Sequence, residues 1–252
     1  MIAAYRRLLA QVRASYSPAK AEDERRHEPL AFLVYRPLSF PITPLFLAAG
    51  FSADAVTVLS VILAVSLPVL ALAGGAAAWP AVVALALAVQ VLDCVDGNIA
   101  RTTGRTSAIG GMLDSLATLC FWAAFFCAVG FLAHGEGAGW IGRHGRELGL
   151  ALALLFVTQR EVEDTHAQYL SERVRFSPPA PAGAPPGFDP GGVAKVAEHV
   201  AAFGGLALAG ATGRLGLFFA AVAAYQVGAT AWWAVRFARR VYAQRAASLD
   251  RS

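Results

Sequence analysis

The sequence predicts an all-α integral membrane protein: a bundle of six transmembrane helices preceded by an N-terminal amphipathic, interfacial segment. Of the 252 residues, 57% are hydrophobic and only 15% are charged, whereas soluble domains carry about 25% charged residues. The apolar residues also occur in long runs, and a helix of about 20 apolar residues is long enough to cross a bilayer. These two observations exclude a water-soluble globular enzyme.

Six stretches have the composition of membrane spans. The first is interrupted only by Pro68, and the second ends in a polar motif. The fourth runs into the charged sequence REVEDTHAQY, and the fifth is short and rich in glycine. The expected spans are residues 55–74, 79–101, 110–133, 147–169, 196–212 and 215–238.

Three segments lie outside these spans. Residues 1–29 mix basic and acidic side chains, which suits a helix on an anionic membrane surface. Residues 30–49 contain RPLSFPITPLF with three prolines, so we expect an interfacial helix there rather than a span. Residues 177–192 form a loop rich in proline and glycine. The membrane domain is expected to cover residues 30–240, followed by a short tail, residues 241–252.

The distribution of lysine and arginine predicts the orientation. Most basic residues fall on one side of the six spans, and positive charge marks the cytoplasmic side. We therefore expect a multi-pass protein of the cell inner membrane, with both termini in the cytoplasm. This bias also explains the net charge of +4 without a nucleic-acid partner.

A polar motif, LDCVDGNIAR, ends the second span. Asp93 and Asp96 are three positions apart and share one face of a helix. Only eight residues follow Arg101 before the next span, so the two spans must be antiparallel, which brings Asp114 to the same end. Three neighbouring carboxylates cannot all ionise in a low dielectric without a cation. Oxygen ligands suit Mg²⁺ or Mn²⁺.

The residues around these aspartates suit a phosphate-bearing ligand. The small residues Gly97, Ala100 and Gly110 leave room for a ligand or for close helix packing. Arg101 and Arg105 stand at the rim, where a guanidinium group can hold phosphate oxygens.

The motif closely resembles the signature of the CDP-alcohol phosphotransferase family: D-x-x-D-G-x-x-A-R, eight residues, then G-x-x-x-D-x-x-x-D. This chain reads Asp93-x-x-Asp96-Gly97-x-x-Ala100-Arg101, eight residues, then Gly110-x-x-x-Asp114. The run GFSADAVTVLS (50–60) is similar to the family's G-x-x-P-N-x-x-T-x-x-S before the first span.

The resemblance implies an enzyme that displaces CMP from a CDP-alcohol with an acceptor hydroxyl, in phospholipid or glycolipid biosynthesis. At least one substrate is expected to be a lipid, and the resemblance also implies a homodimer. By motif position, Asp93, Asp96 and Asp114 hold Mg²⁺ or Mn²⁺. The residues that border the CDP are Gly97, Ala100, Arg101, Arg105 and Gly110, with Thr57 near the nucleotide.

The chain departs from the signature at its last aspartate, where it has Thr118. The family's carboxylate there is the expected general base, a role that threonine cannot fill near neutral pH. Asp164 or His166, at the end of the fourth span, could supply the base, or a metal-bound water could take the proton. A relative that binds CDP-linked ligands without turnover is a further alternative. A cation-dependent transporter is the alternative from another functional class.

Overall fold

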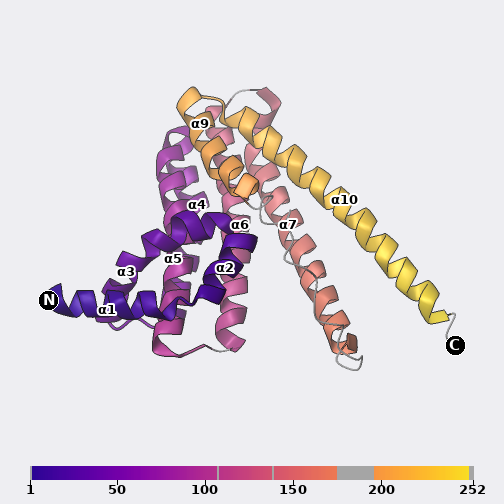
Figure 1. Ribbon diagram of the computed structural model, residues 1–252. Helices are drawn as coiled ribbons and strands as arrows, with labels where there is room; N and C mark the ends of the chain where they lie inside the picture. The colour runs from indigo at the N-terminus through magenta and orange to yellow at the C-terminus, as the bar shows by residue number, and fades with distance from the viewer. Residues whose placement is uncertain (1, 107, 138, 175–195, 250–252) are drawn as a thin grey trace.

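The computed structural model describes residues 2–106, 108–137, 139–174 and 196–249, without the side chains of residues 108, 167–174 and 243–249. Over these residues the chain is helical and contains no strand, which confirms the all-α fold class. Figure 1 shows the main helices running alternately up and down, with α1 lying crosswise at one end. The helices of the bundle are α4 (Ala53–Gly74), α5 (Trp79–Thr103), α6 (Ala108–Glu136), α7 (Gly139–Val174), α9 (Gly205–Thr212) and α10 (Leu215–Leu249).

Among the residues that the structure describes, four segments are long and apolar enough to cross a membrane: Ala31–Ala48, Ala53–Thr103, Ile109–Glu136 and Leu215–Tyr242. The second contains both α4 and α5, joined by a 3₁₀ turn. Val196–Thr212 is apolar but shorter, and α7 has charged residues on both sides of its apolar middle. The protein is therefore an integral membrane protein, while the count of six spans stays a prediction. Ala31–Ala48, expected to be interfacial, has the length and composition of a span.

The N-terminal segment forms two helices, α1 (Ile2–Ser15) and α2 (Pro18–His27). A π-helical turn, Ala31–Tyr35, then leads into α3 (Arg36–Ala48). α2 begins at Pro18 because the side chain of Ser17 accepts a hydrogen bond from the backbone N–H of Lys20. α1 packs against α3 and α5, so the segment is part of the packed structure and not only a surface helix.

Glycines allow α6 and α7 to pack closely at the end opposite α1 (Figure 1). A Cβ atom on Gly130 would lie 2.3 Å from the carbonyl oxygen of Gly145, and one on Gly149 would lie 3.1 Å from the Cα of Gly130. From this contact α7 and α10 diverge from the rest of the bundle toward the end where α5 meets α6 (Figure 1). The aromatic side chains of Phe121 and Phe125 in α6 and of Phe203, just before α9, are buried and contact one another in the core.

The end of α5 determines where the signature residues meet. Gly104 has φ +66, a left-handed conformation that favours glycine, and its N–H closes the helix on the carbonyls of Ala100 and Arg101. The chain then turns directly into α6 (Figure 1). The polar end of α5 and the first turns of α6 therefore lie at the same end of the bundle, as the short connector predicts.

Candidate active site

Asp96 and Thr57 join α5 to α4. The Thr57 hydroxyl donates a hydrogen bond of 2.6 Å to Oδ2 of Asp96, and both side chains are buried. Because this bond satisfies only one lone pair, the carboxylate keeps acceptor capacity for another ligand. The threonine that we placed near the nucleotide is thus in direct contact with a signature aspartate.

Asp93 of α5 lies near Asp114 of α6 and near Asp96, so the three carboxyl groups interact electrostatically. Neighbouring carboxyl groups in a low dielectric cannot all be charged without a cation. The cluster therefore suits a proton or a cation. Asp114 is exposed, so this side of the cluster is open.

The carboxylates of Asp93 and Asp114 are oxygen ligands of the type that Mg²⁺ and Mn²⁺ bind. The part of the chain that the structure describes has no group of three or more His, Cys, Asp or Glu side chains arranged to hold a metal. Mg²⁺, however, usually takes one or two carboxylates and completes its shell with water and substrate phosphates. Asp93 and Asp114 can supply that number of oxygen ligands, so metal binding stays a prediction.

Arg101 folds back over Gly97. A Cβ atom on Gly97 would lie 3.2 Å from Nη1 and 3.3 Å from Nη2 of Arg101, so the glycine leaves room for the guanidinium group. Nη2 donates a hydrogen bond of 3.0 Å to Oδ1 of Asn98, whereas the buried Nε has no hydrogen-bond partner among the described residues. An arginine with an unused donor beside Asp96 is suited to bind a phosphate oxygen.

The other predicted ligand-binding residues lie around the same turn. Arg105 is exposed, and its backbone N–H bonds to the carbonyl of Ala100 at the end of α5. Ala100 and Gly110 are half-buried on either side of the turn. The structure thus brings these residues to one end of α5 and α6, while their roles toward CDP stay predictions.

Sequence reasoning missed a buried polar network next to this site. Asn98, which occupies a variable position of the signature, is fully buried. Its oxygen accepts hydrogen bonds from Nη1 of Arg36 (2.9 Å) and from Arg101. Its amide nitrogen donates to the hydroxyls of Ser39 (2.9 Å) and Thr43 (3.1 Å). All four hydrogen bonds that an asparagine side chain can make are therefore formed.

Arg36 connects this network to the N-terminal helices. Its Nε and Nη2 donate to the two carboxylate oxygens of Glu24, and both side chains are buried. Its Nη1 also donates to the carbonyl of Cys94, at 2.8 Å. The signal that could have revealed Arg36 is an arginine inside an apolar segment, because a charge at that depth needs a partner.

Glu24 is held in its charged form. Burial acts to raise the pKa of Glu24, but the hydrogen bonds and charge of Arg36, the hydroxyl of Tyr16 and the charge of Lys20 outweigh burial and lower it. The Tyr16 hydroxyl donates to Oε2 of Glu24 at 2.9 Å. Burial and this bond in turn raise the pKa of Tyr16.

Thr118 and the two candidate bases lie on α6 and α7. Thr118 is exposed one turn beyond Asp114. Asp164 pairs with Arg160, with Oδ2 and Nε 3.7 Å apart. The His166 ring packs against Phe237 of α10, with 4.9 Å between the ring centroids. The interactions described for Asp164 and His166 are made within α7 and with α10, so their role as bases stays a prediction.

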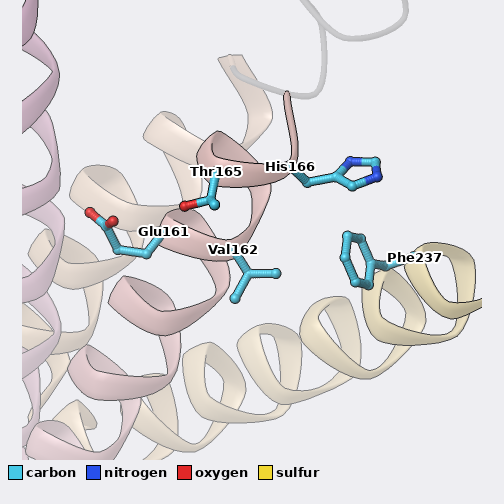
Figure 2. A pocket seen from close by; sticks show the side chains of 5 residues that line it. All are labelled: Glu161, Val162, Thr165, His166 and Phe237. Carbon is cyan, nitrogen blue, oxygen red and sulfur yellow. The ribbon is translucent and has the colours of Figure 1, made fainter. Parts of the chain in front are cut away.

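An open cavity of about 380 Å³ separates α7 from α10 at this end. It is lined by Glu161, Val162, Thr165, His166 and Phe237. Figure 2 shows His166 facing Phe237, whereas Glu161 projects from the other side of α7. The cavity therefore lies beside the candidate base His166.

Comparison with known families agrees with the motif. The sequence model of the CDP-alcohol phosphatidyltransferase family matches residues 51–185, more than half of the chain. The chain belongs to the CDP-alcohol phosphatidyltransferase family. The match begins just before α4 and includes Thr57, both signature helices and α7. No curated protein matches this chain.

The CDP-alcohol phosphatidyltransferase family and the apolar helices together support a membrane transferase of this kind, with a CDP-alcohol and an alcohol acceptor as the substrates that the family implies. The family match leaves out residues 1–50. The helices α1 to α3, with Glu24 and Arg36, therefore lie outside the part of the chain that the family model describes.

Proposed function

We propose that this protein transfers a phosphoalcohol unit, such as a phosphatidyl group, from a CDP-alcohol to a hydroxyl acceptor and releases CMP. The observation that carries the proposal is the meeting of three helices at the signature. Thr57 of α4 donates a hydrogen bond to Asp96 of α5, and Asp93 of α5 lies near Asp114 of α6. Arg101 lies over Gly97 on the same end of α5. This grouping of acidic and basic side chains supports the proposal of a site for a metal-bound pyrophosphate.

The chemistry makes and breaks one bond to phosphorus. The acceptor oxygen bonds to the phosphorus that carries the alcohol, and the bond from this phosphorus to the bridging oxygen breaks. CMP leaves with that electron pair, and the acceptor hydroxyl gives its proton to a general base, for which Asp164 and His166 of α7 are the candidates. Arg101 binds the phosphate oxygens and stabilises the charge that develops on CMP.

Asp93, Asp96 and Asp114 are proposed to hold Mg²⁺ or Mn²⁺ when substrate binds. The ion would neutralise the pyrophosphate and make CMP a better leaving group. Thr57 orients the carboxylate of Asp96 through its hydrogen bond. We further propose that the site and both termini face the cytoplasm, that at least one substrate is a lipid, and that the protein works as a homodimer.

Thr118 favours a second candidate function. It stands at the signature position of the general base and has no carboxylate. A family member without a base would still bind CDP-linked ligands through Arg101 and the aspartates, but would not release CMP.

One experiment separates these two functions. Purified protein is incubated with Mg²⁺ or Mn²⁺, a panel of CDP-alcohols including CDP-diacylglycerol and CDP-choline, and lipid and polyol acceptors. We expect metal-dependent CMP release with one donor, which would also identify the alcohol. Binding of CDP-alcohols without CMP release would instead support the binding function.

A further inference from the structure

A continuous line of hydrogen bonds runs from the N-terminal helices to Arg101. Tyr16 and Arg36 both donate to Glu24, Arg36 donates to Asn98, and Arg101 donates to the same oxygen of Asn98. Asn98 thus receives one arginine from α3 and one from its own helix. The line links α2, α3 and the turn before α2, all outside the family match, to the signature helix.

The hydrogen bonds of this line restrain each side chain to one conformation. Arg36 binds both oxygens of Glu24, and a two-pronged contact of this kind fixes the plane of the guanidinium group. The side chain of Asn98 cannot rotate without breaking its bonds to Arg36, Ser39 and Thr43. Its oxygen therefore stands at a fixed point, three residues before Arg101.

That fixed oxygen anchors Arg101 over Gly97. Nη2 of Arg101 bonds to Asn98 while the guanidinium group lies over Gly97, and its Nε has no partner in the part of the chain that the structure describes. A long arginine side chain loses much rotational freedom when it is held in one conformation. If the network already holds Arg101 in this conformation before the ligand arrives, binding of the ligand does not cause that loss of entropy.

We propose that α2 forms a positioning element of the transferase, in which Glu24 acts through Arg36 and Asn98 to orient the guanidinium group of Arg101 toward the phosphates of the CDP-alcohol. This inference rests on the proposed function, since it assumes that Arg101 binds those phosphates. Glu24, Arg36 and Asn98 are positioning residues and do not touch the substrate.

The test compares two matched glutamates of α2. Glu24→Gln removes the buried charge and keeps the shape of the side chain. Glu22→Gln makes the same change on the exposed face, where Glu22 pairs with Arg25 and Arg26. Binding of CDP with Mg²⁺ to the full chain in nanodiscs is measured by calorimetry. We expect a loss of affinity of about tenfold in Glu24→Gln, the effect of one weakened charged hydrogen bond, and none in Glu22→Gln.

The same substitution in a chain that lacks Arg101 shows whether Glu24 acts by positioning Arg101 or only by stabilising the fold. In an Arg101→Met chain, Glu24→Gln is expected to cause no further loss of CDP affinity, because Glu24 acts only through Arg101. An equal loss in both backgrounds would overturn the proposal and indicate a purely structural role for Glu24.

The remaining outcomes distinguish the two proposals. If the wild-type chain binds CDP and Glu24→Gln binds it equally well, the positioning role is overturned and the proposed function stands. If the wild-type chain does not bind CDP, both are overturned. Should Glu24→Gln fail to fold, Arg36→Lys replaces it, because lysine keeps the charge but cannot bond to Glu24 and Asn98 together. The same tenfold loss is then expected, and unchanged affinity would refute the proposal.

Discussion

The hydroxyl of Thr57 and the carboxylate of Asp96 lie 2.6 Å apart, and this bond fixes α4 against the signature helix α5. We expect Thr57→Val to reduce the rate of CMP release about tenfold, because Asp96 loses the donor that orients it. Thr57→Ser keeps the hydroxyl and is expected to retain most activity. Initial rates of CMP release for the two variants check this expectation, and equal rates for both would show that the bond has no functional role.

The interaction of Asp93 with Asp114 predicts a metal-dependent stability. A cation that binds between carboxylates only in the folded protein raises the melting temperature. We expect Mg²⁺ or Mn²⁺ to raise the melting temperature of the wild-type chain but not that of Asp114→Asn. Without metal, Asp114→Asn is expected to be at least as stable as the wild type, because it relieves repulsion between like charges.

The control for this measurement is Glu147→Gln, which removes an exposed carboxylate at the opposite end of α7. It should respond to the metal as the wild type does. If neither Mg²⁺ nor Mn²⁺ changes the melting temperature of the wild-type chain, the assignment of the signature aspartates as metal ligands is contradicted.

The general base is predicted to lie on α7, since Thr118 cannot act as one. Asp164→Asn or His166→Gln is then expected to lower kcat by the roughly 10²–10⁴-fold typical of the loss of a general base. The measurement is kcat for CMP release across pH, in which the acidic limb of the wild-type profile should change in the affected variant, because a general base loses activity when it is protonated. If both variants retain full activity, the base is supplied from elsewhere, for example by a metal-bound water.

Because Glu24 is charged and paired in the folded protein, we expect acid to destabilise the packing of the N-terminal helices. Its pKa in the folded protein lies below the ordinary value of 4.5, so its stabilising effect is fully present above about pH 4.5 and is lost as the pH falls through the folded pKa. Glu22, with a pKa lowered to about 2, and Asp23 titrate in the same direction on the exposed face of α2.

The corresponding measurement is protease sensitivity of residues 1–35 between pH 6 and pH 3. Wild type should become sensitive in the acidic range. Glu24→Gln should already be sensitive at pH 6, since removing one partner of a buried ion pair costs about 3–5 kcal/mol. Sensitivity that does not depend on pH in the wild type would contradict the role given to the Glu24–Arg36 pair.

The sequence was sufficient to predict the signature cluster because its geometry is local. Asp93 and Asp96 are one helical turn apart, and a short connector forces α6 to return beside α5, which brings Asp114 to them. Thr57 followed from the family pattern. These predictions needed only helical periodicity and one turn.

The buried network was not predictable in the same way. Arg36 and Asn98 are 62 positions apart, and no periodicity links α3 to α5. The three prolines of residues 30–49 indicated an interfacial helix, yet Pro41 and Pro44 lie inside α3. Only the packing of α1 and α3 on α5, and of α2 on the turn before α3, brings Glu24, Arg36 and Asn98 together.

The most direct test of the central claim is CMP release by purified wild-type protein and by Asp96→Asn, each with Mg²⁺ or Mn²⁺ and the donor that the panel identifies. Asp96 contacts Thr57 and neighbours Gly97 beneath Arg101, so we expect CMP release to be abolished in Asp96→Asn while the helical content and elution volume stay those of the wild type. Undiminished CMP release from Asp96→Asn would contradict the placement of the active site at the signature residues.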